Sequence, residues 1–79
     1  MSNVDKLAEV FASALGISPE TAMSAVFKET KEWDSVGHVN LMNAVEESFD
    51  VSLEADDILD FKSFDIGKEI LASRYGVAF

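Results

Sequence analysis

The sequence predicts an all-α protein, an antiparallel bundle of three to four helices. Apolar residues recur at helical spacing in several segments. No stretch of strand length alternates apolar with polar residues and is also rich in β-branched side chains. The 79 residues are 48% hydrophobic and include six Phe, which supplies enough apolar surface for one small core. We therefore expect residues 1–79 to form a single domain.

The first helix is predicted over Asn3–Leu15, with Gly16 as the residue that ends it. Its apolar face consists of Val4, Leu7, Ala8, Phe11, Ala14 and Leu15. The pair Ser18-Pro19 then has the form of an N-cap with proline at the first helical position. Because no sustained helical period follows, we expect one short turn of helix and then a long loop, held against the core by Val26 and Phe27.

The second helix is predicted from Asp34, its N-cap, to about Phe49. One face is apolar and is expected to meet the core through Leu41, Met42, Val45 and Phe49. At 100° per residue the opposite face carries Val36, Asn40, Asn43 and Glu47. Val36 is therefore an apolar residue among polar neighbours.

A short third helix is predicted over Glu54–Asp60, with Ile58 and Leu59 facing inward. The fourth helix is predicted from Phe64 to about Tyr75, because Ser63 can cap its start and Gly76 can end it. We assign five phenylalanines to the core: Phe11, Phe27, Phe49, Phe61 and Phe64.

The charge pattern limits the possible partners. The formal net charge is −9, and the stretch from Glu32 to Phe61 contains nine acidic residues and no Lys or Arg. Binding to nucleic acid is not expected, because neutralising phosphates requires clustered basic residues. No apolar run approaches the roughly 20 residues of a membrane span, and the N-terminus does not have the pattern of a signal peptide. A cytoplasmic protein without membrane insertion is expected.

Two kinds of chemical site fit the sequence poorly. Ser35 and His38 lie three residues apart, but Trp33 replaces the first glycine of a nucleophile elbow and no strand is predicted before it. We therefore expect no enzymatic activity. In the register of a calcium loop from Asp50, the sixth residue is Ala instead of Gly and the twelfth is Phe instead of Glu. A single His without cysteines does not make a zinc centre, so no metal site is expected.

Ser35 stands at the predicted start of a helix. Free amides and the helix dipole favour an anion there, so a phosphate ester on this hydroxyl would be stabilised. The chain has no cysteine, so a cofactor would have to supply any thiol for carrying groups as thioesters. On the residues alone, a serine that only helps to start the helix is the simpler interpretation.

A longer motif around Ser35 favours the other interpretation, in which the serine carries a phosphate ester. The segments Trp33-Asp34-Ser35-Val36-Gly37-His38-Val39 and Glu46-Glu47-Ser48-Phe49-Asp50-Val51 resemble the helix II signature of the acyl carrier and peptidyl carrier protein family. The resemblance extends over most of the chain, since the order of helices and the long first loop also agree. It implies an acyl-carrier-protein-like bundle in which Ser35 carries 4′-phosphopantetheine through a phosphodiester, beside Asp34 and Val36. The terminal thiol of that group would hold an acyl or aminoacyl group as a thioester, and the carrier itself would catalyse nothing.

Departures from the family pattern indicate which kind of carrier the chain resembles. Val36 replaces the usual Leu, Gly37 and His38 follow where many fatty-acid carriers have polar residues, and Asn40 stands where those carriers often have Glu. This form looks more like stand-alone carriers that work beside an adenylating ligase in specialised pathways, and it also resembles D-alanyl carrier proteins. Which group is carried stays open.

The resemblance also implies partners. We expect basic patches on a phosphopantetheinyl transferase, an acyl- or aminoacyl-activating ligase and acyl-transfer or condensing enzymes to bind a monomeric carrier. The expected docking residues are Val36, Val39, Asn40, Glu46, Glu47, Asp56 and Asp57. His38 is expected to be a partly buried, hydrogen-bonded imidazole, and Trp33 an anchor of the loop. The alternative is an acidic helical adaptor that receives no prosthetic group and binds one protein.

Overall fold

Each long helix begins at a residue whose side chain accepts a hydrogen bond from the first turn. Ser2 caps α1 (Asn3–Leu15), Asp34 caps α3 (Ser35–Phe49) and Ser63 caps α5 (Phe64–Tyr75). These helices end at Gly16, Asp50 and Gly76, all in the left-handed conformation. The helix bounds predicted from the sequence are confirmed for these three elements.

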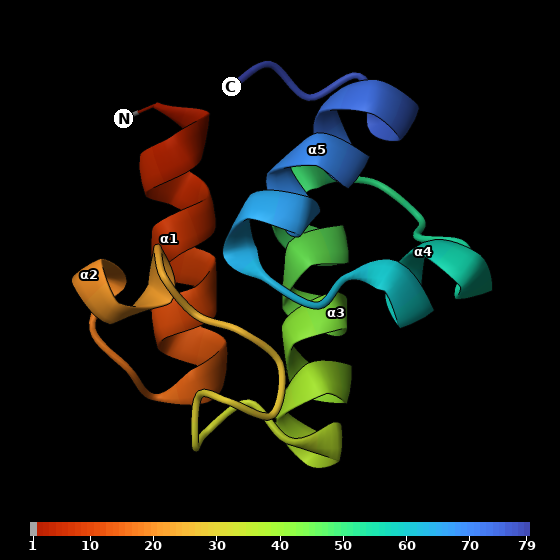
Figure 1. The fold of residues 1–79 in the computed structure, drawn as a ribbon. Helices are drawn as coiled ribbons and strands as arrows, with labels where there is room; N and C mark the ends of the chain where they lie inside the picture. Colours follow the sequence, from red (N-terminus) through yellow and green to blue (C-terminus); the bar gives the residue numbers. More distant parts are fainter. Residues whose placement is uncertain (1) are drawn as a thin grey trace.

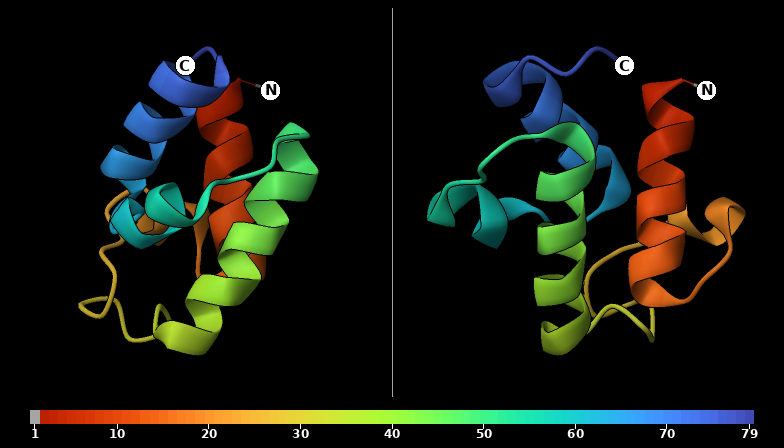
Figure 2. Two further views of the ribbon diagram at one scale, coloured as in Figure 1. Left: turned by 90° about the vertical axis from the view of Figure 1, so that its right-hand side faces the viewer. Right: turned by 180° about the vertical axis from the view of Figure 1, so that it is seen from behind.

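The computed structural model describes residues 2–79, which form five helices and no strand (Figure 1). Two helices are short: α2 (Pro19–Ala22) is one turn and α4 (Ala55–Asp60) has six residues. α1 and α3 run antiparallel. α2 lies on the side of α1 away from α3, and α4 lies on the opposite side of α3 (Figures 1 and 2). The predicted all-α class is confirmed, although the short helices bring the count above the expected three to four.

The buried core consists mostly of aliphatic side chains from the three long helices and contains an aromatic cluster. Phe11 is fully buried and meets Trp33 edge to face, with ring centroids 5.2 Å apart, and Phe64 at 5.1 Å. Phe61 completes the cluster, 6.1 Å from Phe11. Phe27 and Phe49, both predicted to be core residues, are only partly buried and pack against the core.

The long loop after α2 is fixed by backbone contacts to the segment before α5. The Phe27 N–H donates to the Lys62 carbonyl at 2.8 Å, and the Phe64 N–H donates to the Ala25 carbonyl at 3.1 Å. The loop then closes on itself, since the Lys28 N–H donates to the Trp33 carbonyl at 2.9 Å. The expected loop is therefore ordered up to the start of α3.

The prediction for the inward face of α4 is right for Ile58, which packs against the core, and wrong for Leu59. Leu59, expected to face inward, is 68% exposed, whereas Asp57 is 2% exposed and Ile58 only partly buried. α4 turns Asp57 inward because Tyr75 and Arg74 at the end of α5 supply its hydrogen bond and its ion pair. A buried carboxylate is tolerated when both are present.

The two ends of the described chain meet at one end of the bundle. The Asn3 side-chain amide donates to the Ala78 carbonyl at 2.8 Å, and Figure 1 shows the C-terminal segment beside the start of α1. Within residues 2–79, no helix is long and apolar enough to cross a membrane.

Candidate functional site

Ser35 is the first residue of α3 and does not cap it. The Asp34 Oδ1 accepts a hydrogen bond from the Gly37 N–H at 2.8 Å, so the preceding residue satisfies that amide. Serines Ser2, Ser18 and Ser63 cap other helices with their own hydroxyls. At α3 the capping role belongs to a carboxylate, and Ser35 is left exposed to solvent. Its hydroxyl is therefore accessible at a helix N-terminus.

Gly37 lets the loop pass close to the first turn of α3. A Cβ at this position would lie 2.6 Å from the Glu32 carbonyl oxygen and 3.1 Å from the Leu15 side chain. Any side chain larger than hydrogen would push against the backbone just before Ser35. Close packing therefore explains why glycine occupies position 37, which the motif alone did not reveal.

His38 and Trp33 occupy the inner side of the same site. Trp33 is fully buried, and its Nε1–H donates to His38 Nδ1 at 2.9 Å. His38 Nε2 lies 2.8 Å from the Ile58 carbonyl oxygen in α4. The predictions of a buried anchor and of a partly buried, hydrogen-bonded imidazole are confirmed. Because both ring nitrogens have partners, His38 is not positioned as a base for Ser35.

Apolar side chains are exposed around Ser35. Val36 is 71% exposed and Val39 60%, both on the first turns of α3. Asn40 is exposed beside them, as expected. The contact between His38 and Ile58 brings the second half of α4 alongside this part of α3, and Leu59 there is also exposed. Sequence reasoning missed Leu59, because helix α4 is too short for its inward face to be read from periodicity.

The acidic residues expected to form one docking face differ in their exposure to solvent. Glu47 and Asp56 are exposed. Glu46 is partly buried, and its Oε2 accepts a hydrogen bond from the Leu53 N–H at 2.8 Å, so it fixes the loop after α3. Asp57 is buried, which makes its placement on an exposed docking face wrong. Of the four acidic residues expected at the docking face, only Glu47 and Asp56 are exposed.

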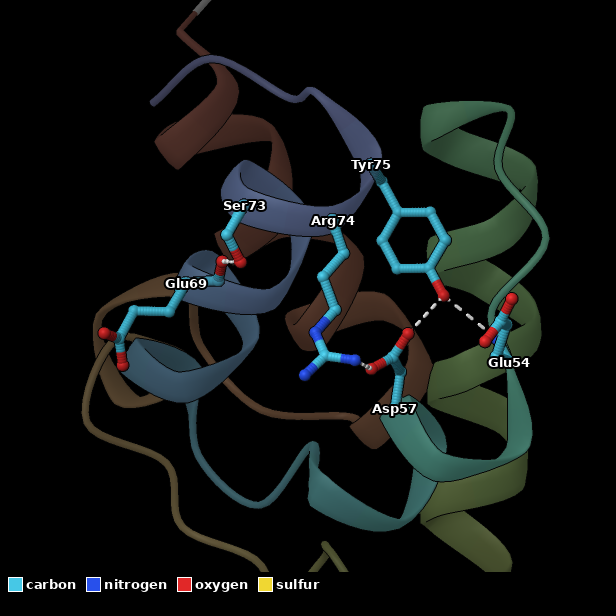
Figure 3. A network of polar contacts seen from close by, with 6 residues as sticks. All are labelled: Glu54, Asp57, Glu69, Ser73, Arg74 and Tyr75. Atoms are coloured by element: carbon cyan, nitrogen blue, oxygen red, sulfur yellow. Dashed lines mark hydrogen bonds and ion pairs between the residues drawn. The ribbon is translucent and has the colours of Figure 1, made fainter.

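Asp57 belongs to a polar network that ties α4 to the end of α5 (Figure 3). The Tyr75 hydroxyl donates to Asp57 Oδ2 at 2.5 Å and accepts from the Glu54 N–H at 2.9 Å. Arg74 Nη1 lies 3.0 Å from Asp57 Oδ1 and supplies the compensating charge. The hydrogen bond to Asp57, assisted by burial, raises the pKa of Tyr75 above its ordinary value of 10.0.

Tyr75→Phe is expected to change the stability of the protein at alkaline pH. A raised pKa means that the folded state holds the phenol proton more tightly than the unfolded state. The contribution of Tyr75 is thus fully present below pH 10 and is lost as the pH rises through the higher pKa of the folded state. Urea unfolding between pH 8 and 11 should show a steeper fall for the wild type than for Tyr75→Phe. Near neutral pH the variant should lose about 1–3 kcal/mol, because Asp57 keeps a buried oxygen without its donor. Parallel pH curves would contradict this role.

Within residues 2–79, no three His, Asp or Glu side chains converge as ligands for a metal ion. Comparisons of the chain with protein-family models, with curated proteins and with solved structures gave no match.

Proposed function

We propose that this chain is a carrier protein of the acyl carrier and peptidyl carrier type, with 4′-phosphopantetheine attached to Ser35. The observation that carries the proposal is the separation of two roles at the start of α3: Asp34 caps the helix, and the adjacent serine is exposed. A serine that served only to start the helix would be expected to use its hydroxyl as the cap, as Ser63 does. The order of the helices supports an acyl-carrier-protein-like bundle.

The residues around Ser35 fit the prosthetic group. A phosphodiester on the Ser35 oxygen would lie at the N-terminus of the fifteen-residue helix α3, where the dipole favours negative charge. Val36 offers an exposed apolar surface directly beside it. When bound, the group supplies the thiol that this cysteine-free chain does not have, and that thiol holds an acyl or aminoacyl group as a thioester.

Loading the carrier requires an enzyme. The Ser35 Oγ would form a bond to the phosphorus that links phosphopantetheine to the nucleotide part of coenzyme A. The bond from that phosphorus to the bridging oxygen of the diphosphate would break, and adenosine 3′,5′-bisphosphate would leave. Since both nitrogens of His38 are engaged, a phosphopantetheinyl transferase would have to supply the base that takes the hydroxyl proton. The carrier contributes the nucleophile and its position.

The charge of the chain supports transient partners with basic surfaces. A carrier must leave each enzyme after delivery, and complementary charge raises the rate of association more than it deepens affinity. Of the acidic residues expected to dock, Glu47 and Asp56 are exposed and can make such contacts, with Val36, Val39 and Leu59 as apolar contacts. An activating ligase and acyl-transfer or condensing enzymes would use the same face in turn.

Mass spectrometry tests the proposal directly. The purified wild-type protein is incubated with coenzyme A and a broad-specificity phosphopantetheinyl transferase, whose activity is verified on a control carrier. The expected result is a gain of one phosphopantetheine unit, placed on Ser35 by peptide mapping. Wild-type protein that stays unmodified would defeat the carrier assignment. It would instead favour the acidic adaptor, which needs no prosthetic group and relies on the exposed Val36 and Val39.

Reversing two charges on the docking face is expected to slow the loading of phosphopantetheine onto Ser35. Glu47→Lys combined with Asp56→Lys should lower the rate of modification, with a smaller effect at high salt because screening already weakens the attraction. The matched control is Glu9→Lys combined with Glu69→Lys, which changes the net charge equally on exposed positions of α1 and α5. The comparison is made from initial rates at two NaCl concentrations. Equal slowing by both pairs would show that net charge, and not this face, controls the encounter.

A further inference from the structure

His38 is the point at which three separate segments meet. Its Nδ1 accepts the hydrogen bond from Trp33 in the loop, and its Nε2 faces the Ile58 carbonyl in α4. His38 itself belongs to α3, within the first turn after Ser35. One imidazole therefore joins the loop that precedes the serine, the helix that carries it and the neighbouring short helix.

The two partners determine the tautomer of the imidazole. The Trp33 indole nitrogen can only donate, so His38 Nδ1 must be the unprotonated acceptor. The Ile58 carbonyl can only accept, so Nε2 must carry the hydrogen. The indole and imidazole rings are nearly coplanar, at an interplanar angle of 20°, as the hydrogen bond between their edges requires, and Phe27 lies 5.1 Å from His38 between ring centroids. Orientation and tautomer are both fixed.

Apolar contacts and one hydrogen bond hold the second half of α4: Ile58 packs against the core, and Phe61, which ends the helix, is fully buried. The only buried residue within α4 is Asp57, which is tied to α5, and Glu54 makes no side-chain cap at its start. Leu59 is 68% exposed, and Ile58 is partly buried. Six residues are far too few for a helix to persist on its own propensity. The hydrogen bond from His38 to Ile58 is therefore the polar tie between α4 and the start of α3.

We infer that His38 is a positioning residue, which holds α4 against α3 and so sets the arrangement of Val36, Val39 and Leu59 that a partner enzyme recognises. This inference rests on the proposed carrier function. The side chain acts through α4 and through the loop and does not touch the reacting oxygen. Its effect is on how well the carrier is bound, and not on the chemical step at Ser35.

The first test is independent of any modification and uses the wild-type protein. Nitrogen-15 NMR of His38 should show an unprotonated Nδ1 and a protonated Nε2. The tautomer with hydrogen on Nδ1 would overturn the inference, because that nitrogen could not accept from Trp33.

The second test uses two substitutions that separate packing from hydrogen bonding. His38→Phe keeps an aromatic ring without either hydrogen bond, whereas His38→Gln retains a side-chain N–H that can donate to Ile58. Hydrogen exchange of the α4 amides and of the Trp33 indole should be faster in His38→Phe than in the wild type. In His38→Gln, the exchange rates of the α4 amides should lie closer to those of the wild type. Unchanged exchange of α4 in His38→Phe would overturn the positioning role.

The third test measures recognition. With a phosphopantetheinyl transferase, His38→Phe should raise the KM for the carrier by at least about fivefold, the lower end of typical coupling between sites, while kcat stays near wild type. His38→Gln should recover part of the loss. A fall in kcat at constant KM, or an unchanged KM despite faster α4 exchange, would contradict the role in recognition. If even the wild type is not modified, the proposed function fails, and the NMR and exchange results still decide whether His38 holds α4.

Discussion

Ser35→Ala is expected to lose phosphopantetheine modification completely and to keep the fold. The hydroxyl oxygen is the proposed nucleophile, and alanine offers no substitute. Stability should change by less than the roughly 0.5–2 kcal/mol that follows loss of an N-cap, because Asp34 continues to accept the Gly37 N–H. Mass spectrometry after transferase treatment and urea unfolding of the same sample measure both effects.

Ser63→Ala provides the reciprocal control. Ser63 caps α5 through its hydroxyl, which accepts the Ile66 N–H at 3.0 Å. Its loss should lower the free energy of unfolding by about 0.5–2 kcal/mol and leave the modification of Ser35 unchanged. The two serine variants should therefore show opposite patterns. Modification that persists in Ser35→Ala would move the attachment site to another hydroxyl, and strong destabilisation by that variant would mean that Ser35 has a structural role.

Gly67→Ala adds only one methyl group, yet it is expected to destabilise the protein strongly. Gly67 is buried in α5 and faces Phe61, so an added Cβ would overlap that aromatic ring. Phe61 is fully buried in the aromatic cluster and has little room to move. The strain should exceed the gain of about 1 kcal/mol in helix propensity. A net loss of about 1–3 kcal/mol is expected, typical of an overpacked core.

A double-mutant cycle gives this prediction a sharp test. Phe61→Leu removes the ring atoms that the new Cβ would meet, so adding Gly67→Ala to it should cost less than adding Gly67→Ala to the wild type. Glu69→Ala, at an exposed position of α5, is the control and should be nearly neutral. The free energies come from urea unfolding at neutral pH. Additive costs would show that the contact with Phe61 is not the cause.

The sequence was a good guide to where helices begin and end. Capping depends on residues within one turn, and Ser2, Asp34, Ser63, Gly16 and Gly76 lie next to the elements they limit. The orientation of α4 was not predictable in the same way. It depends on a contact between Asp57 and Tyr75, which are separated by 18 residues, and a six-residue helix contains too few positions for its buried face to be recognised.

The same distinction applies to the candidate site. Asp34 and Ser35 are neighbours in a recognisable motif, so their placement at the start of α3 follows from the chain itself. The imidazole of His38 was expected to be partly buried and hydrogen-bonded, but its partner in α4 is a backbone carbonyl 20 residues away. Any residue can supply a carbonyl, so the side chains of the sequence contain no signal for that contact.

The contact between Asn3 and Ala78 has a practical consequence for handling the protein. It holds residues 3 and 78 together at the end of the bundle where α1 begins, whereas α3 begins at the opposite end (Figure 1). A tag or surface tether attached at either end would leave the serine pointing outward into solution. Immobilised protein should therefore present Ser35 to a soluble enzyme without obstruction by the support.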